Sequence, residues 1–247
     1  MVTVDGSAIG LGLALQALLL WQCLKVGHWR NYPLFFSYLV YTFLRTIALV
    51  IFRGLKHPAY PLIYWDTNVG AILLRFGVAF EVFRHIFVRE SALGKIAGRA
   101  VVLVLVVFAA AFFLLSNQPG TFFPDLERKS GLAVVSILAV MLVMARYYSV
   151  PVSLNVWGMA VGMGLFCSIS VANFATFDLI RSSFPFWRLV SAFSFSAMML
   201  IWIWALWCYV PDPQPKVLRE SLAQDALAMW KRSWDHFRPN IRRAIGL

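Results

Sequence analysis

Residues 130–145 read SGLAVVSILAVMLVMA, and residues 147–177 read YYSVPVSLNVWGMAVGMGLFCSISVANFATF. Arg146, between them, is the only charged residue from Ser130 to Phe177. A hydrocarbon core about 30 Å thick is crossed by roughly 20 apolar helical residues. The region is too long for one crossing, so it predicts two membrane helices that turn around residues 146–151.

The rest of the chain has the same character. Hydrophobic residues make up 61% of the 247 residues and charged residues only 13%, whereas a soluble domain carries about 25% charged residues. The sequence therefore predicts an all-α, polytopic membrane protein with seven transmembrane helices. The predicted helices span residues 7–24, 34–52, 62–88, 98–115, 131–145, 152–174 and 186–210.

Two regions are expected. Residues 1–210 are predicted to form the seven-helix transmembrane bundle, and residues 211–247 a basic cytoplasmic tail. Apolar residues recur at helical spacing over residues 216–238, among lysines and arginines, which predicts a C-terminal amphipathic helix. Such a helix suits the anionic lipid headgroups of the inner leaflet. The alternative is a docking helix for a cytoplasmic protein partner.

The lysines and arginines predict the orientation, because loops on the cytoplasmic side are enriched in them. With the N-terminus outside and the C-terminus inside, 14 cations lie on the inner side and 6 on the outer side. This placement also argues against nucleic acid as the reason for the net charge of +11. Short loops favour the cytoplasmic (inner) membrane of a bacterium.

Three charged residues are predicted at membrane depth, where charges are costly and usually face the bundle interior. They are Arg45, Arg75 and Glu81. We expect Arg45 to meet Glu81 across adjacent antiparallel helices, which leaves Arg75 without an acidic partner. These residues form our candidate ligand-binding site for an anion such as a carboxylate, a phosphate or a lipid headgroup. The alternative is a buried ion pair, with the second arginine bonded to backbone carbonyls or water.

A second candidate cluster overlaps the first. Glu81, Arg84 and His85 are spaced i, i+3 and i+4, so they share one helix face. Because histidine titrates near neutral pH, this cluster is a candidate proton-linked switch. The alternative is a salt-bridge cluster that holds the helix end to a loop.

Small residues mark one helix as tightly packed. Gly158 and Gly162 form a GxxxG motif, and a second series of small residues follows at every fourth position. This second series is Ala160, Gly164, Ser168 and Ala172. Small residues at this spacing let helix backbones approach closely. We expect packing within the bundle; the alternative is the seam of a homodimer.

No motif indicates a metal or another cofactor. The three cysteines form no CxxC pair and the four histidines are scattered. We find no catalytic constellation, so the sequence leans away from an enzyme. The function that fits best is a sensor-like or regulatory module that binds a small anionic or amphipathic ligand. The alternatives are an anion transporter or permease subunit, and a structural subunit of a larger membrane complex.

Overall fold

The computed structural model describes residues 2–55, 60–87, 98–99, 101–103, 106, 122–147, 150–177, 184–211 and 228. All regular structure in these ranges is helical, which confirms the all-α prediction. The long helices are α1 (Val2–Val26), α3 (Pro33–Gly54), α4 (Tyr60–Phe87), α6 (Phe122–Tyr147), α7 (Leu154–Phe177) and α8 (Phe184–Ala205), and α2 (His28–Asn31) is a single turn.

Four of these helices are long and apolar enough to cross a bilayer. The candidate spans are Ile9–Val26 in α1, Pro33–Gly54 in α3, Leu126–Tyr147 in α6 and Leu154–Asn173 in α7, and a shorter apolar stretch, Phe193–Ala205, lies in α8. Large apolar side chains such as Leu44 and Val143 are exposed on the outside of the spans. The chain is therefore a multi-pass integral membrane protein.

The described helices agree with six of the predicted stretches in position. The stretch at 98–115 and the amphipathic helix at 216–238 lie almost entirely outside the described residues, so the number of crossings and the orientation stay predictions. One boundary differs clearly: α6 begins at Phe122 rather than at residue 131. Its first turns carry charged residues, which a hydropathy reading assigns to a loop.

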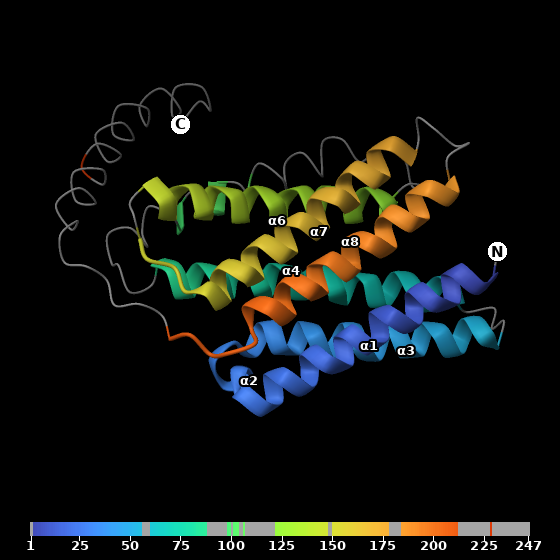
Figure 1. Ribbon diagram of the computed structural model, residues 1–247. Coiled ribbons are helices and arrows are strands. Elements are labelled where there is room, and N and C mark those ends of the chain that lie inside the picture. Colours follow the sequence, from blue (N-terminus) through green and yellow to red (C-terminus); the bar gives the residue numbers. More distant parts are fainter. Residues whose placement is uncertain are drawn as a thin grey trace, which may run out of the picture.

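The long helices lie side by side along one axis, as Figure 1 shows. Neighbours in the sequence pack together, with α3 against α4, α6 against α7 and α7 against α8, while α1 contacts α8 and α3. The end of the bundle that holds α2 is called the α2 end below. It also contains the last turns of α1, α4, α6 and α8 and the first turns of α3 and α7 (Figure 1).

The chain reverses at the α2 end through Gly27. This residue has φ 82°, a left-handed conformation that costs glycine little because it has no Cβ. Pro33 then occupies the first turn of α3, where its missing N–H group breaks no helical hydrogen bond.

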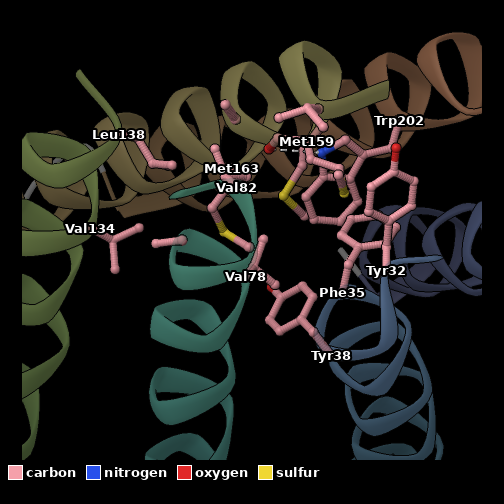
Figure 2. Close-up of a cluster of buried hydrophobic side chains, with 14 of the residues drawn as sticks. Tyr32, Phe35, Tyr38, Val78, Val82, Val134, Leu138, Met159, Met163 and Trp202 are labelled. Carbon is pink, nitrogen blue, oxygen red and sulfur yellow. Dashed lines mark hydrogen bonds between the residues drawn. The ribbon is translucent and has the colours of Figure 1, made fainter. Parts of the chain in front are cut away.

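The core is centred on Trp202 of α8 (Figure 2). Its indole meets the rings of Phe35 and Tyr38 of α3 edge-on, with centroids 4.8 and 6.0 Å apart. Its Nε1 donates to the carbonyl of Met159 in α7 at 3.3 Å. Valines of α4 and α6 complete the cluster from the other side (Figure 2), so one large aromatic residue links three helices.

The GxxxG motif of α7 faces α8. A Cβ added at Gly162 would collide with the indole of Trp202, and one added at Gly158 would collide with the Cβ of Ala205. The two helices therefore approach at a distance that glycine permits.

The second series of small residues turns away from this contact. Ala160 is buried, but Ser168 and Ala172 are exposed, and a Cβ added at Gly164 would meet nothing within 4 Å. Only the first residue of this series is therefore buried within the bundle.

Candidate functional site

A buried ion pair joins α4 to α6. Nη1 of Arg75 lies 2.5 Å from Oε1 of Glu127, and the two side chains are only 7% and 9% exposed. The guanidinium also lies over the ring of Phe166 of α7, 5.4 Å from its centroid. Removing both charges from water is costly, so the pair depends on its close geometry and on its further hydrogen bonds.

Asn68 extends this ion pair toward α3. It lies two turns before Arg75 on α4, hence on the same face of the helix. Its Nδ2 donates to Oε2 of Glu127 at 2.6 Å, and its Oδ1 accepts from Nη2 of Arg45 at 3.2 Å. The four side chains form one continuous polar chain across three helices, which we call the Arg45–Arg75 network: Arg45, Asn68, Glu127 and Arg75.

Arg45 occupies the α3 end of this network and is only half-buried. Its Nε donates to Oγ1 of Thr67 at 3.1 Å, and its Nη2 reaches the carbonyl of Tyr64 at 3.4 Å. Its guanidinium lies over the Tyr64 ring, 5.1 Å from the centroid. All of its acceptors are neutral. Arg75 is ion-paired with Glu127, so the two cations of this network share its single carboxylate.

The expected pairing of Arg45 with Glu81 is wrong. Glu81 lies about 20 Å further along α4 than Asn68, at 1.5 Å per residue, and it is level with the first turn of α3. Its two carboxylate oxygens accept from the backbone N–H groups of Leu34 at 3.2 Å and Phe35 at 2.7 Å. These are donors that the start of an α-helix leaves unsatisfied. Glu81 therefore caps α3 from the neighbouring helix and complements its dipole.

The residues of the candidate switch cluster have different surroundings. Arg84 is exposed. His85 places Nε2 3.2 Å from the carbonyl of Asn31, and its ring centroid lies 4.8 Å from that of Tyr32. His85 thus contacts the end of α2 and Tyr32, whereas Glu81 contacts the first turn of α3.

Polar side chains from other elements hold the C-terminal end of α8. Asn155 of α7 donates through Nδ2 to the carbonyls of Ala205 at 2.7 Å and Cys208 at 2.9 Å, and its Oδ1 accepts from the N–H of Val210 at 2.7 Å. Gln22 of α1 donates to the carbonyl of Trp207. The last carbonyls of a helix have no hydrogen-bond donors within the helix, so these side chains provide the donors.

His28 of α2 belongs to the same cap. Its Nε2 lies 2.9 Å from the carbonyl of Leu206, which identifies Nε2 as the protonated nitrogen. Burial lowers the pKa of His28 below its usual value, although the Leu206 carbonyl acts in the opposite sense. The neutral ring is therefore the form that fits this position.

Glu127, Asn68 and the α8 cap were not predicted from the sequence. The one available signal for Asn68 was its spacing of two turns from Arg75, which places both on one face. For Glu127 no local signal was available, because it lies in a charged run beside the apolar stretch. Among the described residues, no three His, Cys, Asp or Glu side chains are placed to hold a metal ion.

Comparison with known proteins adds no assignment: no protein-family model, no curated protein and no solved structure matches this chain.

Proposed function

We propose that this membrane protein is a sensor-like or regulatory module that binds a small anionic or amphipathic ligand at Arg45. The observation that carries the proposal is the charge imbalance of the Arg45–Arg75 network. Glu127 neutralises Arg75, whereas Arg45 has only neutral acceptors within the described part of the chain.

The charge imbalance matters because Arg45 lies deep in a candidate membrane span. Arg45 lies within the candidate span Pro33–Gly54, about 18 Å from the start of α3 and about 13 Å from its end at 1.5 Å per residue. A cation at such depth is costly, and such residues commonly mark ligand or ion pathways. A carboxylate, phosphate or similar anion beside the guanidinium would remove this cost and bind through charge-assisted hydrogen bonds.

The network also suggests how binding is transmitted. A ligand on Arg45 competes with Asn68 for the guanidinium, and Asn68 also holds Glu127 of α6. Binding would therefore alter the contact of α3 with α4 and the contact of α4 with α6. In this proposal Arg45 contacts the ligand, while Asn68, Glu127 and Arg75 position it.

In this proposal the candidate switch cluster, Glu81, Arg84 and His85, lies in the last two turns of α4, away from Arg45. Glu81 contacts the start of α3 and His85 the last residue of α2, so a shift of α4 against these helices changes the surroundings of both side chains. This is the basis on which the cluster serves as a switch.

The proposal includes the predicted topology: seven crossings, with the N-terminus outside and the C-terminus inside a bacterial cytoplasmic membrane. In support, the exposed charged side chains described at the α2 end are all cationic. A reporter fused to the C-terminus and active only in the cytoplasm should be active; a reporter active only outside would overturn the orientation.

Native mass spectrometry of the gently solubilised protein tests the ligand site. We expect an anionic small molecule retained by the wild type and by the control Arg53→Gln, an exposed cation of the same helix, but lost from Arg45→Gln. Thermal unfolding with a panel of organic carboxylates and phosphates repeats the comparison without relying on retention. If no anion binds the wild type, or if Arg45→Gln binds as well, the proposal is wrong. Counterflow of a labelled anion in proteoliposomes would instead identify a transporter.

A further inference from the structure

Exposed tryptophans gather at one end of this bundle. Those that the structure describes are Trp21, Trp29, Trp157, Trp204 and Trp207. They lie in the last turns of α1 and α8, in α2, in the first turn of α7 and just beyond α8, which all belong to the α2 end (Figure 1). Tryptophan favours the headgroup level of a bilayer because its ring is apolar and its N–H is polar. Exposed tryptophans that are spread over several helices fit a lipid surface better than a single protein partner.

The charges at this end have one sign. The exposed charged side chains described there are Lys25, Arg30, Arg84, Arg99 and Arg146. The carboxylate described at the same end, Glu81, is buried and already bound to the start of α3. The surface therefore complements an anion.

The corner between α1 and α2 combines both features most closely. Nζ of Lys25 lies 4.9 Å from the ring centroid of Trp21, and the guanidinium of Arg30 lies 4.9 Å from that of Trp29. The two cation–ring pairs stand on either side of the turn at Gly27. Leu24, next to Lys25 in the last turn of α1, is 56% exposed and adds an apolar surface.

We propose that this corner is a binding site for an anionic phospholipid. Lys25 and Arg30 would bind its phosphate, and the two indoles would lie beside its glycerol backbone. Leu24 would contact the first methylenes of an acyl chain. The apolar side chains favour a lipid over free phosphate, because an inorganic ion leaves them without a partner. The site is separate from Arg45, so it does not depend on the proposed function.

Native mass spectrometry of the full chain titrated with equal amounts of phosphatidylglycerol and phosphatidylcholine tests this assignment. We expect the wild type to retain phosphatidylglycerol preferentially and Lys25→Gln/Arg30→Gln to lose the preference. A basic residue near an anionic surface contributes roughly 1 kcal/mol, or about fivefold in affinity, so the double variant should lose roughly 25-fold at low salt. Both side chains are exposed, and matching thermal unfolding curves would show that the variant folds.

Two control variants distinguish binding at this corner from nonspecific electrostatic attraction of the anionic lipid to the protein. Arg84→Gln/Arg146→Gln removes the same charge from the same end, and Arg53→Gln/Arg128→Gln removes it from the opposite end. Both should keep most of the preference. The proposal is overturned if the wild type shows no preference, or if Arg84→Gln/Arg146→Gln loses as much as the corner variant. Displacement of the lipid by inorganic phosphate alone would mean that the occupant is a free anion.

Discussion

Replacement of Glu127 by glutamine should destabilise the bundle strongly. The change keeps the shape of the side chain but leaves Arg75 as a buried cation without an anion, since both side chains are less than a tenth exposed. Breaking a buried pair in this way costs about 3–5 kcal/mol. The amide oxygen can still accept one hydrogen bond, which offsets about 0.6–1 kcal/mol. We therefore expect a net loss of about 2–4 kcal/mol.

Reversible unfolding in mixed micelles with increasing SDS, followed by far-UV circular dichroism, measures this loss. Asp66→Asn is a matched control, because it removes an exposed carboxylate from α4, and it should change the stability by less than about 0.5 kcal/mol. Arg75→Met combined with Glu127→Leu replaces the pair by apolar side chains of similar volume. It should recover most of the lost stability.

Two outcomes would refute this reasoning. If Glu127→Gln is as stable as Asp66→Asn, the ion pair does not hold α4 against α6. If the double variant is no more stable than Glu127→Gln, the loss comes from packing and not from the unpaired charge.

Three further predictions concern the packing and capping of α8. Asn155→Ala removes three hydrogen bonds, and at about 1 kcal/mol each the same unfolding assay should show a loss of about 2–3 kcal/mol; a change below about 0.5 kcal/mol would contradict the cap. Gly162→Ala should cost about 1–3 kcal/mol by overpacking against the indole of α8, whereas Gly164→Ala, which meets open space, should be neutral or slightly stabilising; equal effects would show that α7 does not pack this way. Burial lowers the pKa of His28 below 6.5, so below pH 6.5 the unfolded chain binds a proton that the folded one does not, and stability present above that pH is lost on acidification. The unfolding temperature should therefore fall more between pH 8 and 5.5 for the wild type than for His28→Gln, and parallel falls would exclude His28 as the cause.

The helices could be predicted because their signals are local. Long apolar runs locate the spans, because about 20 such residues cross a bilayer as a helix. The small residues of α7 could be recognised by their spacing, but spacing does not tell which face meets another helix. Gly162 faces Trp202, whereas Gly164, two residues later, faces open space.

The partners of the charged residues could not be predicted, because they depend on how the helices align. Arg45 was expected to reach toward Glu81, but α3 and α4 align so that Arg45 is level with Thr67 and Asn68. The sequence predicts that Glu127 lies in a loop, because a run of charged residues is not typical of a membrane helix. Its charge is compensated by Arg75, which is far away in sequence and therefore invisible to a local pattern.

The cap on α8 has a consequence for biogenesis. Gln22 and His28 leave the ribosome well before their acceptors, because the carbonyls of Trp207 and Leu206 are translated more than 170 residues later. Until α8 is inserted, these early side chains lack their final partners. The α2 end of the bundle is therefore completed only when α8 arrives, and a chain truncated before α8 displays unsatisfied polar groups that quality-control proteases of the membrane can recognise.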